Sequence, residues 1–338
     1  MFFYGIRDTS FEFFNSYMSK RSQMVKSNNL KSSLLPINTG VPQGSVLGPV
    51  LFLIYVEDLL RLPIKGKFTA FADDVTPFWH HKDPIMIKEI ISLDLQEIKS
   101  WCDANYLSLN IEKTKILSFK FSFDNLVLNN QPVHLGDITK FLGIQIDSKL
   151  KFSQHVLDLN KKISSGAYAV RCTCSELGPS MAKTTYYALV ESHLRYGVAF
   201  WGNCSQYLFR SVFTIQKRCI RYICGVGLRE HCRPLFKKEN ILTLVSLFIL
   251  ETVCLIHKKY QGVSNTHSYS TRNYNRVPLP IPRYSLTQNS LVYRSIKMYN
   301  KLPSVFRDCN YQDFKEKVKL LLISKAYYTL DEFFSDSL

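Results

Sequence analysis

The sequence predicts an α+β protein, in which antiparallel strands with packed helices are followed by a basic and mostly helical region. An apolar and aromatic run at residues 68–79 is typical of two short strands that meet at a tight turn. From Phe152 onward, apolar residues recur at helical spacing, with breaks at Pro179, Gly202 and residues 225–227. Residues 1–160 carry 17 Lys and Arg against 16 Asp and Glu, whereas residues 161–338 carry 26 against 11. The charge therefore changes where the predicted fold changes.

This charge distribution indicates the kind of partner. A nearly neutral half joined to a half of net charge +15 suits a catalytic module followed by one that holds a polyanion. The alternative is a basic protein whose charge serves only its solubility. The chain has 338 residues, of which 46% are hydrophobic, and this is enough for two or three packed units.

Elements of the first half follow from local signals. Thr9 and Glu12 have the spacing of a capping box that would start a short helix. Residues 22–37 predict a hairpin that turns at the Asn pair 28–29, and a helix should run over residues 45–60. Asp83-Pro84 is a helix start, and the helix should bury one apolar face. The expected buried residues are Ile87, Ile90, Ile91, Leu95, Ile98 and Trp101. Further strands are expected around residues 116–121, 126–128 and 140–146.

The second half predicts helices separated by a polar segment. Residues 241–250 form the most apolar run, which is too short to span a bilayer and predicts a buried helix. Residues 262–285 are rich in Ser, Asn, Tyr, Arg and Pro, as expected of a linker or an extended basic arm. Two last helices are expected at residues 291–300 and 311–328.

Nine cysteines, an odd number without framework spacing, predict reduced thiols rather than a secreted disulfide scaffold. Cys219, Cys224, His231 and Cys232 lack the paired spacing of a zinc site, and Cys172 and Cys174 are expected to be helix thiols. The first residues lack the basic and apolar regions of a signal peptide, and no membrane partner is expected.

Asp73 and Asp74 stand side by side within the apolar run and would be presented together at the turn. Adjacent carboxylates with apolar neighbours are costly unless a positive charge offsets them, and Mg²⁺ prefers such oxygen ligands. Adjacent aspartates are nevertheless common in solvated surface turns, so the pair alone does not decide between these interpretations.

Four ordered segments surround or contain this pair. They are GVPQGSVLGP at residues 40–49, FADDV at 71–75, LNIEKTK at 109–115 and FLGIQID at 141–147. In this order they resemble the palm of reverse transcriptases, specifically those of LINE-type, non-LTR (Jockey-like) retrotransposons. The resemblance is clear over residues 4–201 and weakens afterwards. It implies an RNA-directed DNA polymerase that uses an RNA template, a DNA primer and deoxynucleoside triphosphates.

The resemblance also assigns roles to residues. Asp73 would be the ligand of a two-metal Mg²⁺ site and Asp74 its weaker partner, while Lys113 would protonate the departing pyrophosphate. The loop residues Gly40, Pro42, Gln43 and Gly44 would abut the nucleotide and the templating base. Phe141, Leu142 and Gly143 would form the hairpin that grips the primer. A solvated lysine, a plain loop before a helix and a core strand are the corresponding alternatives.

The implied organisation is a partial fingers and palm at residues 1–150, a helical thumb at 151–225 and a basic C-terminal region at 226–338. The family uses a further Asp from an earlier strand, which this sequence does not contain in the expected place. We therefore expect a C-terminal part of a reverse transcriptase, truncated at its N-terminus and inactive alone. The alternative is a non-catalytic remnant that only binds nucleic acid.

Basic and tyrosine residues alternate between residues 269 and 299, a composition that suits phosphate pairing and base stacking. A solvated basic surface is the alternative. The cationic candidates are Arg272, Arg276, Arg283, Arg294 and Lys297.

Overall fold

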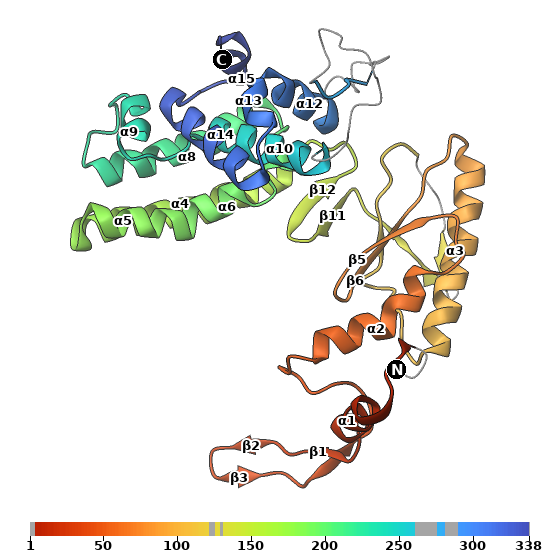
Figure 1. Ribbon diagram of the computed structural model, residues 1–338. Helices are drawn as coiled ribbons and strands as arrows, with labels where there is room; N and C mark the ends of the chain where they lie inside the picture. The colour runs from red at the N-terminus through yellow and green to blue at the C-terminus, as the bar shows by residue number, and fades with distance from the viewer. Residues whose placement is uncertain (1–3, 122–125, 129–130, 261–275, 281–289, 338) are drawn as a thin grey trace. The chain divides into compact units, whose positions relative to one another are not determined.

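The computed structural model describes residues 4–121, 126–128, 131–260, 276–280 and 290–337 (Figure 1). The chain forms two compact units, one of residues 1–116 and 121–135 and the other of residues 117–120 and 136–338. Both helices and antiparallel strand pairs are present, in agreement with the α+β class. The division into palm, thumb and basic region stays a prediction.

The first unit is built from helices and pairs of strands. Its helices are α1 Asp8–Met18, α2 Gly48–Leu60 and α3 Pro84–Ala104. Its strands are β1 Arg21–Gln23, β2 Lys26–Ser27, β3 Leu30–Lys31, β4 Leu35–Ile37, β5 Lys67–Phe71, β6 Asp74–Phe78, β7 Lys115–Ile116, β8 Val127–Leu128, β9 Gln131–Pro132 and β10 His134–Leu135. The antiparallel pairs are β1–β4, β2–β3, β5–β6 and β8–β9, and β7 and β10 are parallel.

The predicted hairpin at residues 22–37 is confirmed, because β2 and β3 turn at Asn28, whose φ is +51°. The predicted capping box is wrong, because α1 begins one residue before Thr9. Its N-cap residue is Arg7, whose side chain makes no capping hydrogen bond. Thr9 therefore lies inside the helix. The predicted strand at residues 116–121 is reduced to β7, and the helix expected from residue 45 begins at Gly48.

The helix α3 organises the core of the first unit. Asp83 accepts a hydrogen bond from the Ile85 amide at 2.8 Å, so the predicted helix start is confirmed. The apolar face of α3 packs with the end of α2 and with β8. The buried residues are Leu59, Ile87, Ile91, Leu95, Ile98, Cys102, Leu126, Leu128 and Val133. Ile90 and Trp101, which were expected to be buried, are half-buried.

The second unit joins one hairpin to a stack of helices. The hairpin strands are β11 Ile138–Phe141 and β12 Ile144–Asp147, so the segment at residues 140–146 turns within itself and is not one strand. The helices are α4 Ser153–Leu177, α5 Pro179–Tyr186, the π-helical turn η2 Tyr187–Glu191, α6 Ser192–Arg195, α7 Val198–Trp201, α8 Gln206–Cys224, α9 Cys232–Lys238, α10 Leu244–Tyr260, α12 Leu291–Lys301, α13 Ser304–Arg307, α14 Tyr311–Lys325 and α15 Leu330–Ser335. The predicted breaks at Pro179, Gly202 and Gly225 are confirmed.

Helices α4 and α8 pack along each other, and α10 lies against both α12 and α14 (Figure 1). The helix predicted from residues 241–250 is confirmed as the buried first half of α10. The largest fully buried side chains of this unit are Trp201, Tyr186, Phe236, Phe248, Phe314 and Phe333. All nine cysteines are free. Among the described residues, no helix is both long and apolar enough to cross a bilayer.

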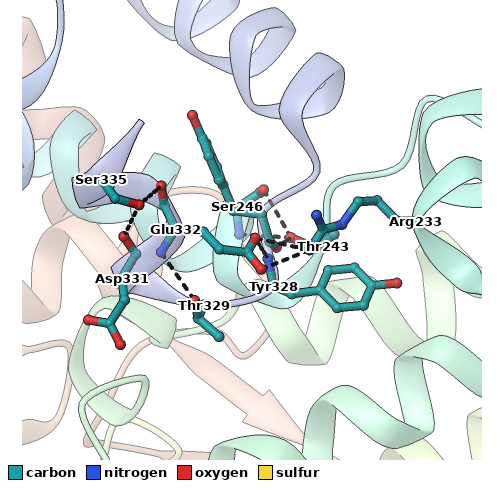
Figure 2. A network of polar contacts seen from close by, with 9 residues as sticks. Arg233, Thr243, Ser246, Tyr328, Thr329, Asp331, Glu332 and Ser335 are labelled. Carbon is teal, nitrogen blue, oxygen red and sulfur yellow. Dashed lines mark hydrogen bonds and ion pairs between the residues drawn. The ribbon is translucent and has the colours of Figure 1, made fainter. Parts of the chain in front are cut away.

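The C-terminal helix α15 is fixed by polar contacts (Figure 2). The Glu332 carboxylate accepts hydrogen bonds from the Arg233 guanidinium at 2.8 and 3.0 Å and from the Tyr328 amide at 3.0 Å. Thr329 caps the helix by accepting from the Glu332 amide at 3.2 Å. The Thr243 hydroxyl donates to the Tyr327 carbonyl at 2.6 Å. The end of the chain is thereby tied to α9 and to the start of α10.

His257 of α10 is only 1% exposed. Its Nε2 lies 3.1 Å from the Cys309 carbonyl, which can only accept, and its Nδ1 lies 3.1 Å from the Tyr299 hydroxyl. The neutral ring can therefore satisfy both contacts, with the proton on Nε2. Burial lowers the pKa of His257 below its ordinary value of 6.5, although the hydrogen bond to Cys309 opposes this.

We expect the free energy of unfolding to fall as the pH drops below about 6.5. Below that pH the unfolded chain takes up a proton at His257 that the folded chain resists, so acid favours unfolding. One such group contributes at most about 1.4 kcal/mol per pH unit. Denaturant unfolding between pH 7 and 5 measures the slope, which should be smaller in His257→Gln and unchanged in the exposed control His80→Gln. An equal slope in wild type and His257→Gln would contradict this assignment.

Candidate functional site

The acid pair lies at the tip of the β5–β6 hairpin. Phe71 pairs with Asp74 in this antiparallel ladder, so Ala72 and Asp73 form a two-residue turn. Ala72 has a φ of +52°, a left-handed conformation that costs an alanine roughly 1–2 kcal/mol. Both carboxylates are exposed, and within the described part of the chain neither makes a side-chain hydrogen bond or an ion pair. The predicted turn between two strands is confirmed, and both acids remain available to a ligand.

A buried carboxylate that sequence reasoning missed holds the base of this hairpin. Asp94 of α3 is 5% exposed and accepts hydrogen bonds from the Gly66 amide at 2.8 Å and from the Trp79 indole at 2.7 Å. It also accepts from the Lys65 amide at 3.2 Å. Such charge-assisted bonds are stronger than neutral ones. Asp94 thereby joins α3 to the segment just before β5 and to the segment just after β6. The acid pair is carried at the opposite end of this hairpin.

The loop at residues 40–44 precedes α2. Gly40 and Gly44 have φ values of +73° and +78°, which glycine adopts without strain, and a β-carbon at either position would meet nothing within 4 Å. The Arg21 guanidinium donates to the Gly40 carbonyl at 2.6 Å. The Ser45 hydroxyl accepts from the Gly48 amide at 3.0 Å and so closes the turn into α2. The loop thus leaves backbone open to an approaching group, while Gln43 is exposed and Pro42 half-buried.

Lys113 lies in a turn of the first unit, where the Asn110 side chain accepts from the Lys113 amide at 3.0 Å. Its side chain is exposed and makes no contact with Asp73 or Asp74 among the described residues. The structure therefore positions its backbone but assigns no partner to its ammonium group.

Asp73 and Asp74 offer carboxylate oxygens, the type of ligand atom that Mg²⁺ prefers. Among the described residues, no group of three His, Cys, Asp or Glu side chains is close enough to hold a metal ion. A two-metal site needs carboxylates that bridge two cations about 3.5–4 Å apart. The acid pair alone therefore does not make up a complete site of this kind among the described residues.

The hairpin at residues 141–143 belongs to the second unit. Leu142 and Gly143 have φ values of +44° and +83°, as in the tight turns that match the twist of hairpin strands. A leucine is rare in this conformation. The Tyr196 hydroxyl donates to the Leu142 carbonyl, and a β-carbon on Gly197 would lie 2.3 Å from Ile144. The segment between α6 and α7 therefore holds this turn in place.

The basic candidates are distributed unevenly over the described residues. Arg276 is exposed, whereas the Arg294 guanidinium donates to the Asn203 side chain at 2.5 Å. The Lys297 ammonium lies 4.8 Å from the centre of the Phe334 ring. Arg272 and Arg283, like most of the expected linker, lie outside the described residues. Arg294 and Lys297 thus take part in the packing of the second unit.

Comparison with known proteins shows which family the segment that carries this site resembles. Residues 4–146 match the family described as "Reverse transcriptase (RNA-dependent DNA polymerase)". This segment contains the acid pair, the loop at residues 40–44, Lys113 and the hairpin at residues 141–143. Residues 4–146 are thus similar to reverse transcriptases. The predicted resemblance to retrotransposon enzymes is confirmed.

Three proteins that are similar to this chain come from mobile elements of Drosophila melanogaster. The chain is 25% identical over 225 residues to "Probable RNA-directed DNA polymerase from transposon X-element" and 25% identical over 224 residues to "RNA-directed DNA polymerase from mobile element jockey". It is 24% identical over 246 residues to "Probable RNA-directed DNA polymerase from transposon BS". These alignments cover 62–68% of the chain. The chain spans about a quarter of the length of these relatives, because the covered shares of their sequences are 25%, 24% and 27%.

Proposed function

We propose that this chain acts within the RNA-directed DNA polymerase of a non-LTR retrotransposon, which extends a DNA primer along an RNA template with deoxynucleoside triphosphates. One observation carries the proposal. Inside the reverse transcriptase segment, Asp73 and Asp74 stand at a hairpin tip with both carboxylates exposed and without side-chain partners among the described residues. Carboxylates in this state can hold divalent cations.

In this proposal Asp73 holds Mg²⁺ and Asp74 adds negative charge beside it. Bound Mg²⁺ would stabilise the charge that develops on the transferred phosphate. The open backbone at Gly40 and Gly44 lets a nucleotide approach, Pro42 shapes the loop, and Gln43 offers both a donor and an acceptor. Lys113 donates a proton to the departing pyrophosphate. Phe141, Leu142 and Gly143 hold the primer end.

The proposed organisation assigns residues 1–150 to fingers and palm, 151–225 to a thumb and 226–338 to a basic region. The net charge of +15 after residue 160 suits a template and primer held by the second half. Arg276, Arg294 and Lys297, together with Arg272 and Arg283 outside the described residues, are the proposed contacts to nucleic acid.

A second candidate function is nucleic-acid binding without polymerisation. The observation that favours it is the absence, among the described residues, of a third metal-binding side chain beside the acid pair. A polymerase site that lacks a bridging carboxylate binds its cations weakly and in the wrong geometry, and small misplacements already cost roughly 100-fold in rate.

Primer extension on an RNA template with Mg²⁺ separates the two candidates. We expect no extension by the 338-residue chain itself, because no third metal-binding side chain joins Asp73 and Asp74 among the described residues. A chimaera that joins this chain to the residues preceding the matched segment of the jockey protein should extend the primer. Synthesis by the chain alone would show that it supplies another ligand. An inactive chimaera beside an active jockey protein would favour the non-catalytic function.

A further inference from the structure

A hollow of about 320 Å³ lies in the second unit where the β11–β12 hairpin meets α4 and α6. The hairpin contributes Lys140, Gly143 and Gln145, and α4 contributes a run of polar residues. This volume is at the lower end of the range for ligand pockets, which begins at about 300 Å³. The hollow therefore suits one small group or one unit of a polymer.

The lining of the hollow is basic. It includes the lysines at positions 140, 161 and 162 and the histidines at 155 and 193, against the single carboxylate of Asp158. The oxygens of Asp158 are already engaged, because Gln145 donates at 2.5 Å to one and Lys161 lies 3.3 Å from the other. Lys140 and Lys162 make no ion pair among the described residues. Two cations are thus left for a ligand.

The walls of the hollow are held in place by the fold itself. The Tyr196 hydroxyl binds the Leu142 carbonyl, and Gln145 is bonded to Asp158 across the junction with α4. The Nδ1 atom of His155 accepts from the Gln145 amide at 3.5 Å, and its Nε2 has no partner among the described residues. Burial, with a further contribution from Lys162, lowers the pKa of His155, so the ring is neutral near pH 7.

We propose that this hollow binds a backbone phosphate of a nucleic-acid strand through Lys140 and Lys162. Lysine binds phosphate as a point charge, and flexible lysines at the rim can follow a strand. A strand is favoured over a free anion because residues 161–338, which lie in the same unit as the hollow, carry a net charge of +15. The inference rests on the proposed function, since it adds a phosphate site beside the hairpin proposed to hold the primer.

The test uses the full chain and a fluorescent RNA–DNA primer–template duplex, with anisotropy measured over a series of salt concentrations. The double variant Lys140→Gln/Lys162→Gln should lower affinity roughly 10-fold and reduce the slope of log K against log salt by about 1 to 2. The matched control Lys237→Gln/Lys238→Gln removes two exposed charges from α9 and should change the slope much less. The variant Lys140→Arg/Lys162→Arg should retain affinity.

Equal losses of duplex affinity in Lys140→Gln/Lys162→Gln and in the control variant would overturn the proposal, because the overall charge of the chain would then explain binding. Binding of a labelled nucleoside triphosphate is the second arm. Binding of the triphosphate by wild type but not by the Lys140→Gln/Lys162→Gln variant, together with equal duplex affinity of the two proteins, would assign the hollow to free phosphates and overturn the strand assignment. The proposed function fails separately if the Lys140→Gln/Lys162→Gln variant loses duplex affinity as expected while the chimaera does not extend the primer. Absence of duplex binding at low salt would overturn both the phosphate site and the proposed function.

Discussion

Asp73→Ala in the jockey chimaera should reduce RNA-templated primer extension by roughly 100-fold or more. The expected cause is loss of a carboxylate that holds Mg²⁺, and charge stabilisation by the cations is the main source of rate in phosphoryl transfer. Binding of the primer–template duplex should be nearly unchanged, because the hairpin tip carries negative charge and the basic residues lie elsewhere in the chain. Extension rate and duplex affinity, measured on the same preparation, check both parts.

The matched control is Asp103→Ala, which also removes an exposed carboxylate from the first unit. Asp103 forms a surface ion pair with Lys99 within α3, and such pairs contribute about 0–1 kcal/mol. This control should leave extension intact. Full activity of Asp73→Ala would show that the acid pair is only a turn, whereas equal losses in both variants would indicate damage to the first unit rather than to a metal site.

The acid hairpin was predictable because its signals are local. An apolar run with two central aspartates fixes both strands and their turn, and the family motifs lie within the same stretches of sequence. The helix start at Asp83-Pro84 and the breaks at Pro179, Gly202 and Gly225 were predictable for the same reason. Each depends on backbone preferences of a few adjacent residues.

Features that join distant residues were not predictable. Asp94 can be buried because three N–H groups, those of Lys65, Gly66 and the Trp79 indole, donate to its carboxylate. No sequence pattern indicates that Gly66 and Asp94, which are 28 positions apart, lie next to each other. The proposed phosphate hollow likewise combines β11, α4 and α6, and only the fold brings their lysines and histidines together. Thr9 and Glu12 show the opposite case, in which a correct local spacing yields to a helix that starts earlier.

Gln216 is a second buried polar residue of this kind, and it is completely inaccessible to solvent. Its amide nitrogen donates to the Tyr186 hydroxyl at 2.8 Å and to the Leu242 carbonyl at 3.0 Å. Its oxygen accepts from the Leu244 amide at 2.8 Å, which is one of the unpaired N–H groups at the start of α10. One side chain on α8 therefore satisfies groups from α5, from the loop before α10 and from α10 itself.

Gln216→Leu should lower the free energy of unfolding by about 3–5 kcal/mol, a loss measurable by urea denaturation. Leucine fills a similar volume, so the loss comes from three buried polar groups left without partners, each of which costs about 1–3 kcal/mol. A single domain has about 5–15 kcal/mol of stability, so the second unit should become marginal.

Tyr186→Phe provides the control, because it removes one of the three groups and leaves the amide of Gln216 paired on two sides. This variant alone should cost about 1 kcal/mol. In the double variant Gln216→Leu/Tyr186→Phe the hydroxyl that would be left unpaired is gone, so the double variant should be more stable than Gln216→Leu. If the two losses simply add, the Tyr186 contact contributes nothing. If Gln216→Leu is as stable as the wild type, water or a rearranged backbone satisfies these groups, and the buried amide does not hold α10 to α8.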